Sequence, residues 1–188
     1  MTVAGLVLAA GEGRRFGGPK AVAVLDGERL VDRAARTLRE GGCDPIAVVS
    51  GAVDLELPGV LVVPNADWRS GMGSSLRRGL SALPAGVDAV VVLLVDTPFV
   101  AAAAVTRLLE AASGSPAAIA TYAGRRGHPV LLARGIWSQV SELSVGDVAA
   151  KAWLQAHPHE VLEVDCTGLG DPRDIDTPEQ LAAARRPE

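Results

Sequence analysis

Residues 3–20 read Val-Ala-Gly-Leu-Val-Leu-Ala-Ala-Gly-Glu-Gly-Arg-Arg-Phe-Gly-Gly-Pro-Lys, an apolar run that passes directly into a glycine-rich loop. The run Val3–Ala9 is short and rich in valine and leucine, which predicts a buried β-strand. A loop at the carboxyl end of such a strand lies where open α/β sheets bind their ligands. The stretch therefore predicts an α/β fold with a ligand site at its first strand-to-helix connection.

Strand-like and helix-like segments alternate along the rest of the chain. Short runs rich in Val, Leu and Ile predict further strands at Ile46–Ser50, Val60–Val63, Ala89–Val95, Ala117–Ala120, Pro129–Leu132 and Val161–Val164. Helix-like segments lie between them, at Glu28–Glu40, Ser74–Leu83, Ala101–Ala112, Arg134–Val140, Asp147–Ala156 and Pro178–Arg185. This alternation favours a largely parallel sheet with helices on both faces. Residues 1–188 contain no linker or repeat, so we expect a single domain.

The composition narrows the class of protein. Of the 188 residues, 48% are hydrophobic but only 3% are aromatic, so valine, leucine and alanine must build the core, as in sheets buried on both faces. The formal net charge of −4 argues against a nucleic-acid-binding protein with its broad basic face. Basic residues nevertheless cluster at Arg14, Arg15 and Lys20, which indicates a small anionic ligand.

The cysteines and the N-terminal run bear on the location of the protein. Cys43 and Cys166 form no CxxC pair, which favours two ordinary free thiols in a reducing cytoplasm over a disulfide framework or a zinc site. The apolar run Val3–Ala10 is too short to cross a membrane and follows no basic segment of the kind found in signal peptides. We therefore expect a cytoplasmic protein without a membrane partner.

The glycine-rich loop fits neither of two familiar nucleotide-binding motifs. A Walker A loop requires Ser or Thr after its lysine, but Ala21 follows Lys20. A dinucleotide fingerprint requires a third glycine where Phe16 stands. Glycines still let the backbone approach phosphate oxygens, while Arg15 can bind phosphate with its forked guanidinium and Lys20 adds a compact charge. The alternative is a long connection whose basic residues are incidental.

Two further stretches follow predicted strands. Residues 65–76 read Asn-Ala-Asp-Trp-Arg-Ser-Gly-Met-Gly-Ser-Ser-Leu and lead into a helix that Ser74 or Ser75 can cap. A glycine-flanked helix N-terminus is equally a site for ribose, base or phosphate oxygens. Asp96 ends an apolar run and precedes Thr97-Pro98. Its carboxylate either caps the next helix or holds magnesium, which proteins usually bind with one or two carboxylates plus substrate phosphates.

The C-terminal half adds a histidine and a pair of acidic residues. His128 lies in a basic turn, residues 125–129, where a lone histidine is more often structural than catalytic. Asp174 and Asp176 lie in the string Asp-Ile-Asp-Thr-Pro. That string is typical of a helix capped by Thr177, and it is equally compatible with metal or substrate ligands. The residues alone leave both alternatives open.

Taken together, these strings resemble the MobA-like NTP transferases, which activate small molecules by joining them to nucleotides. The first loop matches the pattern LAAGxGxRxGxPK, although Gly13 stands where serine is often found and Phe16 where methionine is common. The strings GMGSS, GHPV and DIDTP extend the resemblance from Val3 to Leu181, closest to the cytidylyltransferase-like branch. The resemblance implies a three-layer α/β/α, Rossmann-like nucleotidyltransferase fold with a mostly parallel, mixed sheet.

The resemblance also implies roles for individual residues. The nucleotide is expected to contact Leu8, Ala9, Ala10, Gly11, Arg15, Lys20, Asn65, Gly73 and Ser75. His128 is expected beside the acceptor phosphate or a metal-bound water. Asp96 and Asp176 are the expected ligands of a magnesium cofactor. Arg15, Lys20 and Asp96 are the expected catalytic residues, which position two anions and neutralise their charge without a covalent enzyme intermediate.

The implied reaction transfers a nucleoside monophosphate from an NTP to a phosphorylated small molecule and releases pyrophosphate. The opening LAAG, in place of LAGG, favours CTP over GTP, and the cytidylyltransferase-like branch implies the molybdenum cofactor as acceptor. Residues 144–151 depart from the family's SGDxGAR pattern, with Val145 before Gly146 and Lys151 near the usual arginine. These departures leave the identity of the acceptor open.

Three other functions are compatible with these residues. A transferase with the same site can act on another acceptor, such as a sugar phosphate or phospholactate. A non-transferase protein of this fold can bind a cofactor or carry out redox chemistry, although the absent dinucleotide fingerprint argues against a nicotinamide-dependent oxidoreductase. A carrier can hand the cofactor to a partner such as a molybdenum hydroxylase through a transient contact.

Overall fold

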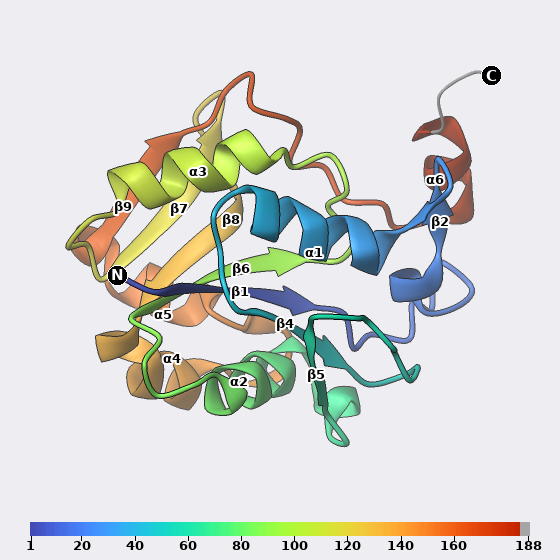
Figure 1. The fold of residues 1–188 in the computed structure, drawn as a ribbon, viewed down its shortest axis with the longest axis horizontal. Helices are drawn as coiled ribbons and strands as arrows, with labels where there is room; N and C mark the ends of the chain where they lie inside the picture. Colours follow the sequence, from blue (N-terminus) through green and yellow to red (C-terminus); the bar gives the residue numbers. More distant parts are fainter. Residues whose placement is uncertain (185–188) are drawn as a thin grey trace.

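The computed structural model describes residues 1–184, with a seven-stranded sheet at its centre (Figure 1). Its strands are β1 (Val3–Leu8), β4 (Ile46–Ser50), β5 (Leu61–Pro64), β6 (Ala89–Leu94), β7 (Ala117–Tyr122), β8 (Arg125–Ala133) and β9 (Val161–Asp165). The order across the sheet is β5-β4-β1-β6-β8-β7-β9. β8 runs antiparallel to both of its neighbours, and the other pairs are parallel. The sheet is therefore mixed and mostly parallel, as predicted.

Helices cover both faces of the sheet and produce the three layers visible in Figure 1. One face carries α1 (Leu30–Glu40) and α3 (Ala102–Ala111). The other face carries α2 (Met72–Ala82), α4 (Trp137–Leu143) and α5 (Lys151–Ala156). α6 (Pro178–Ala184) follows close to the C-terminus. The expected three-layer α/β/α architecture is confirmed.

Two apolar clusters fill the spaces between the sheet and its helices, because successive strand residues point to opposite faces. In β1, Val3 and Val7 belong to the cluster beneath α1 and α3, whereas Leu6 and Leu8 belong to the cluster beneath α2, α4 and α5. All four side chains are buried. The continuous apolar run at the start of the chain thus reflects a strand that is covered on both sides.

Several elements begin or end differently from the sequence-based expectation. β8 is longer than the run Pro129–Leu132 because its first half forms a hairpin with β7. α1 begins at Leu30 because Glu28–Arg29, as β3, pairs with β2 (Val24–Leu25). Two other expected helices begin as 3-10 turns, at Arg134–Ile136 and Gly146–Val148, before α4 and α5 start. The last expected helix reaches Arg185, which lies outside the described residues.

The start of α2 rules out one of the two alternatives, that Ser74 or Ser75 caps the helix. The helix begins at Met72, so Ser74 and Ser75 lie inside its first turn and neither serves as the cap. Gly71 occupies the N-cap position and has no side chain to offer. Instead Asp147 Oδ1 accepts a hydrogen bond from the Met72 N–H at 3.2 Å. The acceptor at the start of α2 thus comes from a distant part of the chain.

The cap of α6, the two cysteines and the lengths of the helices also bear on the sequence-based predictions. Thr177 Oγ1 accepts the Gln180 N–H at 3.3 Å, as expected of the residue that caps α6. Cys43 and Cys166 are both buried and free, and burial raises the pKa of the Cys43 thiol to about 12. Within residues 1–184, no helix is long and apolar enough to cross a bilayer.

Candidate active site

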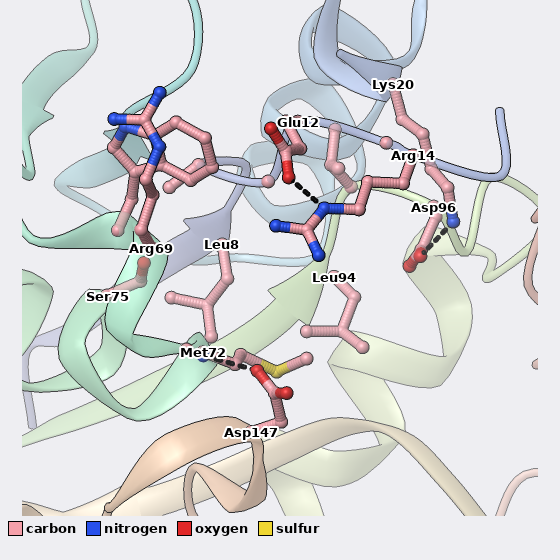
Figure 2. Close-up of a pocket in the computed structure, with 16 residues that line it drawn as sticks. Leu8, Glu12, Arg14, Lys20, Arg69, Met72, Ser75, Leu94, Asp96 and Asp147 are labelled. Atoms are coloured by element: carbon pink, nitrogen blue, oxygen red, sulfur yellow. Dashed lines mark hydrogen bonds and ion pairs between the residues drawn. The ribbon is translucent and has the colours of Figure 1, made fainter. Parts of the chain in front are cut away.

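Four segments meet at one edge of the sheet: the loops that follow β1, β5 and β6, and the connection between α4 and α5. They enclose a space of about 400 Å³, here called the first cavity (Figure 2). Its lining residues are Leu8, Ala10, Gly11, Glu12, Gly13, Arg14, Lys20, Trp68, Arg69, Gly71, Met72, Ser75, Leu94, Val95, Asp96 and Asp147. The residues predicted from the sequence to form the site and found in this lining are Leu8, Ala10, Gly11, Lys20, Ser75 and Asp96.

The glycine-rich loop turns back on itself around Gly13. The carbonyl of Gly13 accepts hydrogen bonds from the N–H groups of Phe16, Gly17 and Gly18 at 2.9, 2.9 and 3.2 Å. Gly13 has a φ of +64°, and a β-carbon there would overlap the carbonyl of Gly18, so only glycine fits. The N–H groups of residues 11–15 donate to no acceptor in the described part of the chain. Consecutive free N–H groups in a turn form a binding site for phosphate.

A cluster of charged side chains lies beside this loop. The Lys20 ammonium lies 2.9 Å from Asp96 Oδ2 and 2.7 Å from Asp176 Oδ1. Arg15 Nη2 lies 2.8 Å from Asp176 Oδ2, although 76% of the arginine side chain is exposed. Burial acts to lower the pKa of Lys20, but its hydrogen bonds to the two carboxylates outweigh burial and raise that pKa above 10.5. The hydrogen bond from Lys20 lowers the pKa of Asp176.

Asp176 reaches this cluster because the segment before α6 runs along the loop that follows β6. The Ile175 N–H donates to the carbonyl of Asp96 at 2.8 Å, and Val100 forms a β-bridge with Gly170. Ile175 is itself buried in the core. The structure thus brings together Lys20, Asp96 and Asp176, which the sequence predicted separately.

The carboxylates fit the predicted divalent cation. Asp96 Oδ1 is buried and has no hydrogen-bond partner among the described residues. Asp96 does not cap the next helix, because α3 begins at Ala102 without a side-chain cap. No group of three or more His, Cys, Asp or Glu side chains within residues 1–184 is arranged to hold a metal. A cation here would therefore rely on Asp96 and Asp176 together with phosphates and water, which is the usual ligand set of magnesium.

Arg14 lines the first cavity, although Arg15 was the arginine expected there. Figure 2 shows the Arg14 guanidinium above the cavity, where it pairs with Glu12 of the same loop. Arg15 is absent from the lining and pairs with Asp176. Adjacent residues of a loop point in different directions, so their spacing alone does not tell which one faces a ligand. Further lining side chains without a prior expectation are Trp68, Arg69, Met72, Leu94 and Asp147.

Asn65 is buried and supports the start of α2 without lining the first cavity. Its Nδ2 donates to Ser74 Oγ at 2.9 Å and to Ser75 Oγ at 3.1 Å. Its Oδ1 accepts the Asp67 N–H at 3.1 Å. Because Ser75 lines the cavity, Asn65 positions a cavity residue, whereas its direct contact with a nucleotide stays a prediction.

Gly73 and Ala9 are also absent from the lining. A β-carbon on Gly73 would overlap the carbonyl of Ser144, so glycine allows α2 to pack directly against the connection between α4 and α5. Arg77 donates a hydrogen bond to the same carbonyl. The buried Ala9 donates its N–H to Val49 O at 3.0 Å and extends the pairing of β1 with β4. The predicted contacts of Gly73 and Ala9 with the nucleotide stay untested.

A second cavity of about 400 Å³ adjoins the first. The two cavities share four lining residues, Leu8, Met72, Leu94 and Asp147. Most other walls of the second cavity are aliphatic, and its further polar side chains are Arg126, His128, Lys151 and Gln155. His128 Nδ1 lies 3.4 Å from Val92 O, and burial lowers the pKa of the imidazole. His128 thus lines the second cavity and not the first, and its contact with the acceptor phosphate or a metal-bound water stays a prediction.

Two adjoining cavities, one of them suited to phosphates, are what an enzyme requires to bring a nucleotide to a second substrate. Residues 5–161 match a family model described as the MobA-like NTP transferase domain. The chain therefore belongs to the MobA-like NTP transferase family of nucleotidyltransferases, which confirms the resemblance of the motifs. Enzymes of this family generally depend on a divalent metal ion.

Individual relatives cover most of the chain. It is 36% identical over 193 residues to the nicotine blue oxidoreductase of Paenarthrobacter nicotinovorans, across 95% of this chain and 94% of the relative. It is 36% identical over 165 residues to a molybdenum cofactor guanylyltransferase of Cereibacter sphaeroides, across 86% of this chain and 80% of the relative. The crystal structure of the Rv0371c homolog from Mycobacterium sp. strain JC1 has a TM-score of 0.83 at 30% identity, across 97% of this chain and 96% of that chain.

Proposed function

We propose that the protein transfers CMP from CTP to the phosphate of the molybdenum cofactor and releases pyrophosphate, with magnesium as cofactor. The observation that carries this proposal is the first cavity, which is lined by residues 11–14 with their free N–H groups, by Lys20 and by Asp96, whose Oδ1 has no partner among the described residues. A triphosphate requires anion-binding groups at several positions together with a divalent cation. The guanylyltransferase relative supports the molybdenum cofactor as acceptor.

The residues of the first cavity bind and orient the substrates without forming a covalent bond to them. The loop N–H groups and Arg14 bind the phosphates, and Lys20 neutralises charge on the departing pyrophosphate. Magnesium held by Asp96 would add charge neutralisation at the reacting phosphate. The two cavities adjoin at Leu8 and Leu94, which line both of them. An acceptor bound in the second cavity would reach the nucleotide there, and an oxygen of the acceptor's phosphate would attack the α-phosphorus in line with the departing pyrophosphate.

The preference for CTP rests on Ala10. This residue lines the first cavity and packs against Gly51, where a β-carbon would lie 2.8 Å from the Ala10 Cβ. Glycine at position 10, as in the opening LAGG, would free the volume of one methyl group in the cavity wall next to Gly51, and we propose that the base binds against this wall. The narrower space favours a pyrimidine over a purine. The guanylyltransferase relative makes GTP the alternative nucleotide.

The second cavity favours an acceptor with a flat ring. Its walls are mostly aliphatic, and three of its five polar side chains have protein partners: Arg126 pairs with Glu163 at 2.8 Å, His128 Nδ1 lies 3.4 Å from Val92 O, and Asp147 accepts the Met72 N–H. The hydroxyls of a sugar phosphate would find few free partners there, and unpaired polar groups are costly to bury. The faces of a pterin ring pack well on aliphatic walls. The exposed Lys151 offers a cation for the acceptor phosphate.

The proposed setting is a reducing cytoplasm, where buried free thiols stay reduced. The net charge of −4 fits small anionic substrates better than nucleic acid. The product would pass to a molybdenum hydroxylase through a transient contact.

The decisive experiment measures pyrophosphate release with magnesium, the molybdenum cofactor and each of the four NTPs. We expect release with CTP, and we expect Asp96→Ala to lower the rate by about 10²–10³-fold, which corresponds to the loss of one electrostatic contact worth roughly 3–4 kcal/mol in the transition state. Asp54→Ala is the matched control, because this exposed carboxylate lines neither cavity. Normal turnover by a folded Asp96→Ala protein would refute the proposed mechanism.

The nature of the acceptor has its own control. Glucose 1-phosphate and phospholactate are offered in place of the molybdenum cofactor under the same conditions. Pyrophosphate release with either of them, and none with the molybdenum cofactor, would keep the nucleotidyl transfer but replace the acceptor.

A second candidate function is the reduction or oxidation of an aromatic dye. The observation in its favour is the relative named nicotine blue oxidoreductase, which matches 95% of this chain, together with the aliphatic second cavity. The absence of a dinucleotide fingerprint still argues against a nicotinamide cofactor. The test follows the absorbance of nicotine blue with NADH or NADPH. Dye turnover that survives Asp96→Ala, without pyrophosphate release from any NTP, would favour the oxidoreductase.

A further inference from the structure

Lys20 occupies the space between Asp96 and Asp176, the two carboxylates that the sequence predicts as ligands of the metal. Its ammonium lies 2.9 Å from Asp96 Oδ2 and 2.7 Å from Asp176 Oδ1, and only 14% of the side chain is exposed. Arg15 Nη2 engages the other oxygen of Asp176 at 2.8 Å. Of the four carboxylate oxygens, Asp96 Oδ1 is the one left without a partner within residues 1–184.

One free oxygen does not make a magnesium site in the protein without nucleotide. Magnesium requires near-octahedral oxygen coordination and is usually bound by one or two carboxylates plus substrate phosphates. The cluster also contains two cationic and two anionic side chains, so its formal charge is zero. While Lys20 stays in place, a further cation finds a single free carboxylate oxygen and no net attraction.

A bound triphosphate changes this balance. Its oxygens would lie against the free N–H groups of residues 11–14, in the cavity that Lys20 also lines. The lysine side chain is long and flexible and carries three donors, so it can leave the carboxylates for the phosphates. Asp96 and Asp176 would then each have free oxygens, next to phosphates that supply further ligands.

We infer that Lys20 keeps the metal site closed until the nucleotide binds. This inference rests on the proposed function, because it needs an NTP in the first cavity. Lys20 thereby determines when the cation can bind, in addition to contacting the triphosphate. Binding linkage is reciprocal, so the nucleotide and the metal must each strengthen the binding of the other by the same factor.

The test measures binding of Mn²⁺, a paramagnetic substitute for magnesium, from the electron paramagnetic resonance signal of the free ion. The variant is Lys20→Met, which keeps an unbranched side chain, shorter by the terminal ammonium, and removes its charge. Without nucleotide, we expect this variant to bind Mn²⁺ about 5- to 150-fold tighter than the wild type, the usual range of coupling between two sites. An α,β-methylene analogue of CTP should tighten Mn²⁺ binding strongly in the wild type and much less in the variant.

Three further variants locate the effect. Lys151→Met removes the same charge from the exposed lysine of the second cavity and should leave Mn²⁺ affinity within about twofold of the wild type. Lys20→Arg keeps a cation at the carboxylates and should keep the site closed. The double variant Lys20→Met with Asp96→Asn should lose the gain in affinity. Circular dichroism verifies that each variant is folded.

Several outcomes would overturn the inference: Mn²⁺ binding by Lys20→Met no tighter than by the wild type, an equal gain from Lys151→Met, or tight binding by the wild type without nucleotide. Failure of the proposed function is recognised separately, because Mn²⁺ titration without nucleotide involves no turnover. If no NTP is consumed but Lys20→Met alone binds Mn²⁺ tighter, the closed site stands and the transfer fails. If pyrophosphate is released from CTP but Lys20→Met binds Mn²⁺ no tighter than the wild type, the nucleotidyl transfer stands and the closed metal site is refuted.

Discussion

Replacement of Asn65 with alanine tests whether this residue supports α2 or contacts the nucleotide. The change removes three hydrogen bonds, to Ser74 Oγ, Ser75 Oγ and the Asp67 N–H, from a residue that is only 5% exposed. At a net contribution of about 1 kcal/mol per hydrogen bond, the free energy of unfolding should fall by about 3 kcal/mol. That is a large share of the roughly 5–15 kcal/mol typical of native proteins.

The assay is urea unfolding followed by circular dichroism. With a slope of about 2–3 kcal/mol per molar urea, the midpoint of Asn65→Ala should fall by roughly 1–1.5 M. Ser81→Ala serves as the control, because this exposed hydroxyl of α2 donates only to Arg78 O and its loss should cost less than about 0.5 kcal/mol. The KM for CTP should also rise in Asn65→Ala, since Ser75 loses its orientation. A stability loss below about 1 kcal/mol with a tenfold higher KM would refute the supporting role and make Asn65 a direct ligand.

Three further predictions concern the base, the helix contact and pH. Ala10→Gly should raise kcat/KM for GTP relative to CTP in the pyrophosphate assay, and an unchanged ratio would remove Ala10 as the residue that selects the base. Gly73→Ala should lower the free energy of unfolding in urea by about 1–3 kcal/mol, because its β-carbon meets the Ser144 carbonyl; unchanged stability would mean that the two segments separate easily. The Lys20–Asp176 pair should stabilise the fold between about pH 5 and 9, because the folded-state pKa is lowered for Asp176 and raised for Lys20. The contribution of the pair to stability is lost as the pH falls through the lowered pKa of Asp176 or rises through the raised pKa of Lys20. The urea midpoints of the wild type and Asp176→Asn should therefore converge below about pH 4. A constant difference between these midpoints down to pH 2 would contradict the pairing.

The fold was predictable because its strands carry their own signal. A strand covered by helices on both faces must be apolar at every position, and the runs that became β1, β4 and β6 meet this condition in the sequence alone. The start of α2 was not predictable in the same way. Its acceptor is Asp147, and no local pattern around Met72 shows that a carboxylate from beyond α4 will reach it.

The active site, too, combines residues that local sequence motifs predict with contacts that depend on distant parts of the chain. Lys20 and Asp96 could be selected because each stands in a local motif at the end of a buried strand, where ligands bind. That one lysine would engage both predicted metal ligands could not be foreseen, because it depends on the pairing of Ile175 with Asp96. Similarly, only the course of the loop decides that Arg14 lines the first cavity while Arg15 turns to Asp176.

The relatives of this chain include one named as an oxidoreductase and one named as a guanylyltransferase, so the fold by itself does not determine which reaction is catalysed. An oxidoreductase acting on a dye requires the aliphatic second cavity, but it does not require a divalent cation in the first. Nucleotidyl transfer requires both. Asp96 Oδ1 is buried and has no partner among residues 1–184, and an unsatisfied buried acceptor costs roughly 1–3 kcal/mol of stability. A cation that binds with the nucleotide would satisfy Asp96 Oδ1 and offset this cost. A reaction without a metal would leave the oxygen unsatisfied. The buried oxygen therefore favours the transferase over the oxidoreductase.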